Sequence, residues 1–526
     1  GLTIANGGTV QFLGANTYSG VTNIHGGTLE AQDGSNIDVY SEIQFSGAGS
    51  IGATNGTALS MASAGVLLSG GTFTRFVGAG PTDVTWTGSG GFAATSGGLT
   101  VNLGALNGGA GPTLNWGSGS FTPVGSVLVF GSDATDATGT VTFENAINLQ
   151  QQAGNIAVYD NTASANAYAV MTGAISNGVL NVNDVGFAGT LYLTAQNSLS
   201  GLTLNAGTLS TTYGGRVGTL MNTGSGGYLT INGGTVDLGG AEKLTTVSVA
   251  SGATLNAAGL VSAGAITTAG TVSFMDGLNA ASIDNSGLLT LNGATIVSGA
   301  VTNEAAGQLD QFGNMSAASA VNNGAWYLTG NLTASGAVTN NGTLVVVGVI
   351  PSGSSVDATA ATRTLTTSGF AGGANGVVQL GGINGTVANT LVINQSGAST
   401  YNGVFEGAGG LTKQGAGALS LGGASSFTGP VLISGGTLAL VGAGSIADAS
   451  NVTDNATFDI SGTTAGASVV TLSGNGQVNL GSQTLTLSNA STTFSGVIGG
   501  AGSVGVAAGT ETLTGVNTYT GTTAIV

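Results

Sequence analysis

A short phrase recurs through residues 246–350: an apolar residue, a few small polar residues, a glycine, and then an apolar strand. The steps between successive copies are 17, 17, 18, 20 and 17 residues, from copies that begin at Val249, Ile266, Ile283, Val301, Val321 and Val338. Within each copy, apolar residues alternate with Thr, Ser or Asn, as in LLTLNG, which is the period of a β-strand. Gly and Asn lie between the strands, where the chain must turn. The pattern predicts short strands joined by tight corners.

A unit of this size cannot bury its apolar face alone, but it can do so when stacked on copies of itself. Successive coils would then lie about 4.8 Å apart, with the inward Val, Ile and Leu forming a continuous column. Because parallel crossovers are almost always right-handed, the repeat predicts a right-handed parallel β-helix (β-solenoid), all-β, with roughly 17–25 residues per coil. At roughly 20 residues per coil the chain would form about 26 coils and a rod on the order of 120 Å.

The composition fits an ordered, weakly charged solenoid. The chain has 526 residues, of which 98 are Gly and only five are Pro, and no three-residue glycine period runs through it, which excludes collagen. Hydrophobic residues make up 41%, enough for a core, whereas charged residues make up 5%, against roughly 25% in ordinary soluble domains. The surface must therefore be made of Asn, Thr, Ser and backbone. The absence of cysteine excludes disulfides and thiolate metal sites.

Basic residues are scarce: five Lys and Arg stand against 22 acidic residues, for a formal net charge of −17. Nucleic-acid binding needs clustered Lys and Arg, and the basic residues here are dispersed, so no nucleic-acid partner is expected. No apolar run approaches the roughly 20 residues of a membrane-spanning helix, and the N-terminus does not resemble a signal peptide.

A second, longer repeat occurs near both ends of the chain. GLTIANGGTVQFLGANTYSGVTNIHGGTLEA (residues 1–31) aligns with GLTKQGAGALSLGGASSFTGPVLISGGTLAL (residues 410–440), and related copies cover residues 189–210 and the segment that ends at Val526. A bulky residue precedes a glycine by two positions in every copy, at Tyr18/Gly20, Leu199/Gly201, Phe427/Gly429 and Tyr519/Gly521. We interpret the bulky residue as an inward plug and the glycine as the residue that permits the bend.

This phrase resembles the passenger-associated repeat of bacterial autotransporters (type V secretion), whose usual form runs LTKxGxGTLTLSGxNTYTGxTTIxGGTL. The segment from Leu411 to Leu438 keeps LTKQGAG, FTG and ISGGTL, and residues 90–149 are also similar to large passengers of this type. The resemblance implies a secreted β-helical passenger at the bacterial cell surface, anchored to the outer membrane or released. It also implies a C-terminal membrane β-barrel in the full-length chain.

Both ends of the sequence interrupt a repeat, since Gly1 enters one partway and Val526 leaves one before GGTL. We therefore expect a segment of a longer chain. Within one continuous solenoid we expect three parts: wider coils with more aromatic residues in 1–215, a short-coil array in 216–350, and long repeats in 351–526 that follow the polar stretch PSGSSVDATAATRT.

Several motifs that carry chemistry in other proteins are better explained as structure here. GxGxxG occurs at Gly47–Gly52 and Gly500–Gly505, but glycine is so frequent that on the order of 3 chance matches are expected, and no helical period follows as a dinucleotide site requires. His25 is the only histidine, so any Ser-His-Asp triad must use it, yet no serine is indicated as a nucleophile. We expect His25 to be an exposed coil residue.

Carboxylate pairs are candidate catalytic groups, because many parallel β-helices degrade polysaccharides and glycoside hydrolysis requires two carboxyl groups roughly 5–9.5 Å apart. Stacking could bring Asp284 near Glu304, or Asp237 near Glu242, although basic residues are too few to surround such acids. Asp133 and Asp136 could hold a hard cation weakly, but a solvated loop is favoured. The threonines of TLTLS (residues 484–488) evoke ice-binding arrays, but Thr is simply favoured on outward strand faces.

No catalytic, cofactor-binding or metal-binding residue is therefore predicted, and no cofactor. The sequence favours a non-enzymatic, extracellular structural or adhesive stalk or fibre. Its expected partners are other copies of itself or neighbouring cell surfaces and glycans. Two alternatives remain open: a subunit of a self-assembling filament or sheath, whose open ends add further copies, and a polysaccharide-degrading β-helix enzyme.

Overall fold

The computed structural model describes residues 1–52, 56–221, 226–349 and 357–525. Every regular element in these residues is a β-strand, and they contain no helix. Apart from the hairpin of β22 (Thr212–Tyr213) and β23 (Arg216–Val217), all strand pairs with a described register are parallel. The prediction of an all-β parallel solenoid is confirmed.

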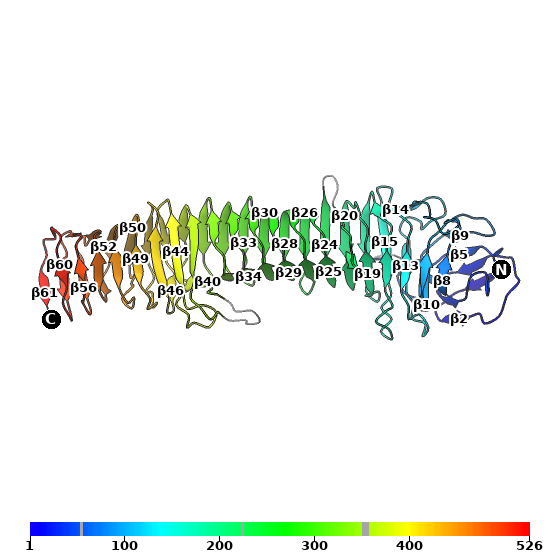
Figure 1. Cartoon of the computed structure of the whole chain (residues 1–526), viewed down its shortest axis with the longest axis horizontal. Helices are drawn as coiled ribbons and strands as arrows, with labels where there is room; N and C mark the ends of the chain where they lie inside the picture. The colour runs from blue at the N-terminus through cyan, green and yellow to red at the C-terminus, as the bar shows by residue number, and fades with distance from the viewer. Residues whose placement is uncertain (53–55, 222–225, 350–356, 526) are drawn as a thin grey trace. The chain divides into compact units, whose positions relative to one another are not determined.

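The chain divides into two compact units. Unit 1 comprises Gly1–Gly264 with Gly270–Asp276, and unit 2 comprises Ala265–Ala269 with Gly277–Val526. In each unit a strand pairs with its counterpart in the coil before and in the coil after, as β13, β19 and β25 do in unit 1 and β44 and β49 do in unit 2 (Figure 1). Strand β28 (Val261–Thr268) contributes residues to both units.

Unit 1 is built from several parallel ladders. The first ladder contains β2 (Thr9–Gln11), β4 (Gly27–Glu30), β8 (Gly65–Phe73), β10 (Gly90–Val101), β12 (Val127–Phe130), β15 (Ala153–Val158), β18 (Val179–Val182), β20 (Gly201–Leu204), β24 (Gly227–Ile231) and β26 (Glu242–Val249). From β10 a second ladder continues through β13 (Val141–Phe143), β16 (Ala169–Met171), β19 (Thr190–Leu193), β21 (Thr208–Ser210), β25 (Thr235–Leu238), β27 (Thr254–Ala257) and β29 (Thr271–Phe274). Shorter ladders are β1 (Leu2–Ile4), β3 (Thr22–Ile24), β5 (Ile43–Phe45) and β9 (Val84–Trp86); β11 (Leu114–Asn115), β14 (Ile147–Asn148) and β17 (Ile175–Ser176); and β6 (Gly49–Ser50) with β7 (Thr57–Ala58).

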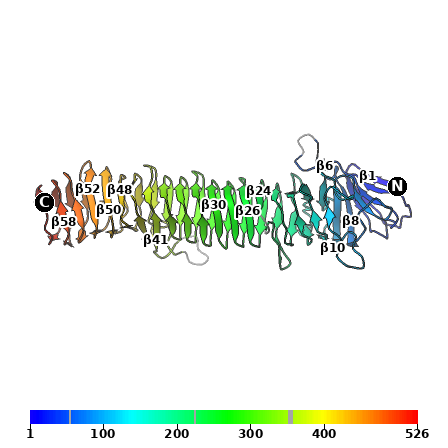
Figure 2. The ribbon, with the colours of Figure 1, turned by 90° about the horizontal axis from the view of Figure 1, so that it is seen from above.

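Unit 2 has the same construction, and the strands of one of its faces are clearest in Figure 2. One ladder contains β30 (Leu278–Asn285), β33 (Ala300–Asn303), β36 (Ser319–Asn322), β39 (Ala337–Asn340) and β42 (Gly369–Ala371), and another contains β31 (Leu288–Leu291), β34 (Gln308–Gln311), β37 (Ala325–Leu328), β40 (Thr343–Val346), β43 (Val377–Gln379) and β46 (Val404–Glu406). A third contains β32 (Thr295–Val297), β35 (Met315–Ala317), β38 (Leu332–Ala334), β41 (Thr362–Thr367), β44 (Thr390–Gln395), β47 (Gly410–Gln414), β49 (Val431–Ile433), β51 (Val452–Asp454), β54 (Leu472–Gly474), β57 (Thr493–Phe494) and β60 (Thr512–Leu513). The remaining ladders are β45 (Ser399–Tyr401), β48 (Ala418–Leu421), β50 (Thr437–Gly442), β52 (Thr457–Thr463), β55 (Gln477–Asn479) and β58 (Val497–Gly499), and β53 (Ala467–Val469), β56 (Thr484–Leu487), β59 (Ser503–Val506) and β61 (Thr523–Ile525).

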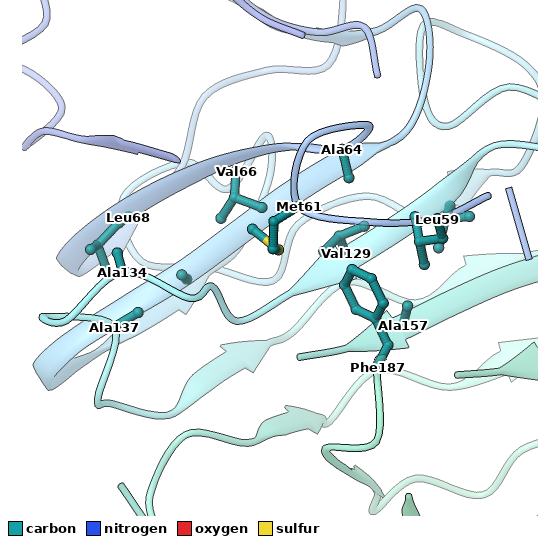
Figure 3. Close-up of a cluster of buried hydrophobic side chains, with 12 residues drawn as sticks. Leu59, Met61, Ala64, Val66, Leu68, Val129, Ala134, Ala137, Ala157 and Phe187 are labelled. Atoms are coloured by element: carbon teal, nitrogen blue, oxygen red, sulfur yellow. The ribbon is translucent and has the colours of Figure 1, made fainter. Parts of the chain in front are cut away.

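The core consists of columns of inward side chains, because the same strand position points inward in successive coils. In unit 2, Leu411, Val431, Val452 and Leu472 follow one another in register, and each is fully buried. In the N-terminal part of unit 1, a separate cluster of buried apolar side chains packs together, with Phe187 beside Ala157 and Val129 (Figure 3). Each buried apolar side chain stabilises the stack by roughly 1.5–3 kcal/mol relative to an exposed one.

A buried asparagine ladder runs along the corner of unit 2. Each side-chain amide donates to the next carboxamide oxygen: Asn285 to Asn303 at 2.7 Å, Asn303 to Asn322 at 2.8 Å, and Asn322 to Asn340 at 2.8 Å. The ladder ends on the hydroxyl of Tyr401, 3.2 Å from Asn340 Nδ2. These hydrogen bonds satisfy buried polar groups. Leaving one such group without a partner would cost roughly 1–3 kcal/mol of stability.

The structure corrects two details expected from the repeats. Val301 stands in register with Ala320, not with Val321, so the coil steps there are 19 and then 18 residues. The glycines after the plug residues do not have positive φ; a Cβ at Gly429 would overlap the backbone of Gly409 in the neighbouring coil, so close packing is the reason for glycine. Of the plugs, Leu199 and Phe427 are buried, whereas Tyr18 and Tyr519 are half-buried. Part of the polar stretch after residue 350 lies outside the described residues.

Candidate functional site

The structure places the residues singled out in the sequence in separate strands and turns. His25 is exposed, and its Nδ1 lies 3.2 Å from the hydroxyl of Ser46. Asp284 stands in register with Thr302, and Glu304 follows the end of β33, where its backbone N–H donates to the carbonyl of Asn285. The first carboxylate pair is therefore not in register across the two neighbouring coils.

The second carboxylate pair is separated by orientation. Asp237 points outward and accepts a 2.8 Å hydrogen bond from the amide of Asn256. Glu242 points inward, is 3% exposed, and accepts the backbone N–H groups of Leu220 at 2.8 Å and Met221 at 2.9 Å. Burial raises the pKa of Glu242 to about 7, although the two N–H donors act in the opposite direction. Glu242 therefore anchors a loop within unit 1, because it supplies acceptors for backbone donors that are otherwise unpaired.

The remaining motifs lie in turns and strands. Asp133 and Asp136 are both exposed, and the described residues contain no group of three or more His, Cys, Asp or Glu that could hold a metal. The motif Gly47–Gly52 forms a corner with the short strand β6, and Gly500–Gly505 leads directly into β59. On β56, Thr484 and Thr486 point outward while the intervening leucine is buried, as expected for a half-buried strand.

Several buried ionisable residues of unit 2 were missed from the sequence, and Lys413 and Asp454 are two of them. Lys413, in the LTK of the repeat, is fully buried, and its ammonium donates to the carbonyls of Gln414, Gly415 and Gly435 at 2.7, 3.1 and 3.2 Å. Burial lowers the pKa of Lys413 to about 8. Ile4 occupies the same position in the first copy of the phrase, but inward orientation was not expected for Lys413 because Lys is rarely buried completely.

Asp454 is the second. It lies in the same inward column as Lys413, separated from it by Ile433. Its Oδ1 accepts the backbone N–H of Ala456 at 3.0 Å, whereas its buried Oδ2 has no hydrogen-bond partner. Burial raises the pKa of Asp454 to about 6. Both residues serve the interior of the coil stack and present no charge to solvent.

The outer surface of unit 1 carries an aromatic cluster that the sequence did not reveal. Tyr168, Tyr192 and Tyr213 lie with ring centroids 4.8–5.6 Å apart, and the hydroxyls of Tyr168 and Tyr213 are 3.0 Å apart. We call these three residues the tyrosine cluster. They are 21 to 45 residues apart in sequence, so their proximity depends on the register of β16 and β19 and on the hairpin that carries Tyr213.

The outer faces also contain shallow grooves. A groove of about 410 Å³ in unit 2 is lined by small residues of the strands β50, β53 and β56 and the turns between them, among them Gly442, Ser468 and Thr486. No charged side chain lines it.

Among the described residues no helix is long and apolar enough to cross a membrane.

Comparison with known proteins supports the interpretation of the long repeat. The family model described as passenger-associated-transport-repeat matches residues 1–31, 188–210, 411–440 and 508–525. The chain is also 40% identical over 97 residues to the "Adhesin BmaC autotransporter" of Brucella suis biovar 1 (strain 1330). That match covers 18% of this chain and 3% of the adhesin, so the chain spans a small part of this relative's length.

The matched repeats correspond to particular parts of the coils. In the copy at residues 411–440, the LTK forms β47 with the buried ammonium, the phenylalanine plug is buried, and the last residues form β50. The residues of the motif therefore form the strands of one coil and the buried side chains that pack it on the next. The repeats, the parallel solenoid and the adhesin segment together support a passenger domain of a bacterial autotransporter, exposed at the cell surface or secreted at the outer membrane.

Proposed function

We propose that the chain acts as a non-enzymatic, adhesive and structural stalk at the bacterial surface. The observation that supports this role best is the long succession of parallel coils in register in each unit, with weakly charged outer faces. Such a stack presents the same type of surface repeatedly, and it is held by core columns and polar ladders that leave few side chains for catalysis.

The distribution of ionisable side chains supports the same role. Glu242, Asp454 and Lys413 are engaged inside the coils, and Arg75 forms a 2.6 Å ion pair with Asp33 in which both side chains are largely buried. A hydrolase of acidic polysaccharides would instead need carboxyl groups that converge on an exposed cleft. The name of the Brucella relative, an adhesin, points in the same direction.

The test is adherence by bacteria that display the full-length protein. We expect them to adhere to host cells or to abiotic surfaces more than the same strain displaying a version from which coils of this region have been removed. Equal adherence, with equal surface display measured by antibody labelling, would contradict the proposal.

Two alternatives are separated by further measurements. Electron microscopy of the purified chain would show regular polymers if it is a filament or sheath subunit, and isolated particles if it is a stalk. Turnover of a panel of acidic polysaccharides that disappears in Asp284→Asn or Glu304→Gln would establish an enzyme instead.

A further inference from the structure

The tyrosine cluster is held by a hairpin that projects from the coil of unit 1. Strands β22 and β23 are antiparallel, and the turn between them is Gly214–Gly215, with φ of 57° and 77°. Two consecutive residues with positive φ are the requirement of the tight hairpin turn that matches strand twist, which explains the glycine pair. The hairpin places Tyr213 against Tyr168 and Tyr192, and it places Arg216 directly across from Tyr213.

Arg216 differs from the other basic residues of the chain. Arg75 is paired with Asp33, Arg363 donates to the carbonyls of Val347 and Gly348 at 2.8 and 2.9 Å, and the ammonium of Lys413 is bound by three carbonyls. Lys243 has an interaction partner as well. Arg216 is exposed, and within the described residues its guanidinium has no hydrogen bond and no ion pair.

An exposed, unpaired guanidinium is a binding group for carboxylates, because its planar fork matches the two carboxylate oxygens. Its pairing across the hairpin with Tyr213, a member of the tyrosine cluster, adds a second requirement for the ligand. Tyrosine offers an apolar ring and a polar hydroxyl together, so it suits a molecule with an apolar face and a polar rim. A sugar ring has this construction, with C–H groups on its face and hydroxyls around its edge.

Further polar groups adjoin the cluster on the same face of unit 1. In the column that contains Tyr192, Ser210 of the next coil is buried, and the column continues through the outward Asp237 and Asn256. Beside it, threonines stand in register at Thr190, Thr208, Thr235, Thr254 and Thr271. Coils lie about 4.8 Å apart, so these side chains offer hydroxyl, carboxylate and amide groups at a spacing that neighbouring sugar hydroxyls can reach.

The net charge of the chain restricts the ligand further. At −17, the protein repels dense polyanions. A single cation paired across the hairpin with Tyr213 therefore suits one carboxylate on an otherwise neutral glycan. The hydrogen bond to Tyr168, together with burial, raises the pKa of Tyr213 to about 12, so its hydroxyl stays neutral across physiological pH and does not add negative charge.

We propose that Arg216 and the tyrosine cluster form a binding site for a terminal carboxylate-bearing sugar on a glycan. The carboxylate pairs with Arg216, the sugar ring packs on Tyr213 and Tyr192, and Asp237 and the outward threonines accept or donate bonds to its hydroxyls. This inference deepens the proposed adhesive role and takes its biological purpose from it. Two sources share the chemistry: sialic acid at the end of a host glycan, and a uronic acid at the end of a microbial or plant oligosaccharide.

The binding test uses the purified chain and ligand-observed NMR or immobilised glycans. The probes are sialyllactose, an oligosaccharide whose only charged group is a terminal glucuronate, the uncharged parent lactose, and a polygalacturonate oligomer. We expect weak binding of one of the two terminally acidic probes, with Kd on the order of 1 mM or below, and at least about 10-fold weaker binding of lactose and of the polyanion. Which acidic probe binds identifies the source.

Matched variants separate the site from general charge. Arg216→Gln is expected to weaken binding of the acidic probe about 10-fold or more. Arg216→Lys should change the logarithm of Kd by about half as much, because the ammonium keeps the charge but lacks the planar fork. Tyr213→Ala should weaken binding although it leaves every charge in place. Lys243→Gln removes the same charge from the exposed face of β26, in another ladder, and should leave binding unchanged. Far-ultraviolet circular dichroism and the unfolding midpoint verify that each variant is folded.

Equal binding of sialyllactose, the glucuronate probe and lactose would overturn the inference, as would equal effects of Arg216→Gln and Lys243→Gln. Adherence of bacteria displaying full-length Arg216→Gln distinguishes this failure from failure of the adhesive role. If the chain binds no acidic glycan while displaying bacteria still adhere, the site assignment is wrong and the adhesive proposal stands. If the chain binds the glycan while adherence never depends on the protein, the site stands and the adhesive proposal is wrong.

Discussion

Individual residues in this protein are selected mainly by the distance to the next coil. A column of glycines in unit 2 illustrates this: a Cβ on Gly324 would overlap the carbonyl oxygen of Gly307, and one on Gly342 would overlap that of Gly324. None of these three glycines has a positive φ. Glycine is required there because a coil approaches its neighbour so closely that no side chain fits between them.

The change Gly324→Ala is therefore expected to destabilise unit 2 by roughly 1–3 kcal/mol, because the backbone must shift to admit the methyl group. Gly373→Ala is the matched control, since its Cβ would meet only Asn341 Oδ1 at an ordinary 3.5 Å. Urea unfolding followed by circular dichroism measures the difference. Equal midpoints for the two variants would show that the spacing between coils can adjust to the methyl group at little energetic cost.

Asp454 predicts an unusual pH dependence of stability. Its pKa is raised in the folded chain to about 6 from an ordinary value of 3.8, so the folded state holds the proton more tightly than the unfolded state. The contribution to the free energy of unfolding is therefore fully present below about pH 4, and it is lost as the pH rises through 6. The loss is on the order of 3 kcal/mol at most.

Asp454→Asn should remove this loss and should be more stable than the wild type at pH 8, with little difference at pH 4. Asp448→Asn, at an exposed position of the same unit, is the control and should follow the wild-type profile. Urea midpoints at pH 4, 6 and 8 give the comparison. Parallel profiles for the wild type and Asp454→Asn would contradict the role assigned to this carboxyl group.

At the scale of the strands, register decides which side chains are inside. Val301, Ala320 and Val338 occupy the same position in three successive coils, so residues 301–337 comprise two complete coils. The asparagine ladder follows the same register, since Asn303, Asn322 and Asn340 are each two residues further on.

Deletion of residues 301–337 should therefore leave a folded unit 2, because Val338 takes the place of Val301 and Asn340 takes the place of Asn303 above Asn285. Deletion of residues 301–336 differs by one residue and should fail to fold or aggregate, because a shift of one position turns the buried face outward. Circular dichroism, size-exclusion chromatography and the unfolding midpoint distinguish the two. Similar behaviour of both deletions would mean that the coils do not specify their register.

Across the molecule as a whole, the scarcity and placement of basic residues limit the sites open to trypsin-like proteases. Arg75 and Lys413 are buried, Arg363 is bound to backbone carbonyls, and Lys243 lies within strand β26. Arg216 lies at an exposed hairpin turn, which is the type of segment that proteases cleave first. For a protein displayed outside the cell, this arrangement gives resistance to cleavage by trypsin-like proteases.

Limited trypsin digestion of the native chain should thus give one early cleavage after Arg216, with fragments that end at Arg216 and begin at Val217. The variant Arg216→Gln should remain intact over the same period, whereas Lys243→Gln should be cleaved like the wild type. Mass spectrometry of the time course identifies the sites. Early cleavage at Lys243 or Arg363 would contradict the described protection.

Much of the fold follows from local sequence pattern, whereas the candidate site does not. The spacing of the phrase in residues 246–350 and the alternation along strands such as LLTLNG predicted parallel stacked coils, since these features report the period and the inward face directly. The register at Ala320 was missed because Val321 also fits the apolar position, and only packing on Val301 distinguishes them. The inward direction of Lys413 was missed because its three acceptors are backbone carbonyls, which have no sequence signature.

The sequence by itself determined the architecture of this protein: apolar alternation of period two, corners of Gly and Asn, and a repeat too small to bury its own core leave stacking as the stable arrangement. The tertiary structure alone decided which distant residues meet. Tyr168 and Tyr213 are brought together because the coils between them differ in length and because the hairpin turns Tyr213 back over the sheet. Loop length and register are set by the packing of whole coils, and local residue preferences do not encode them.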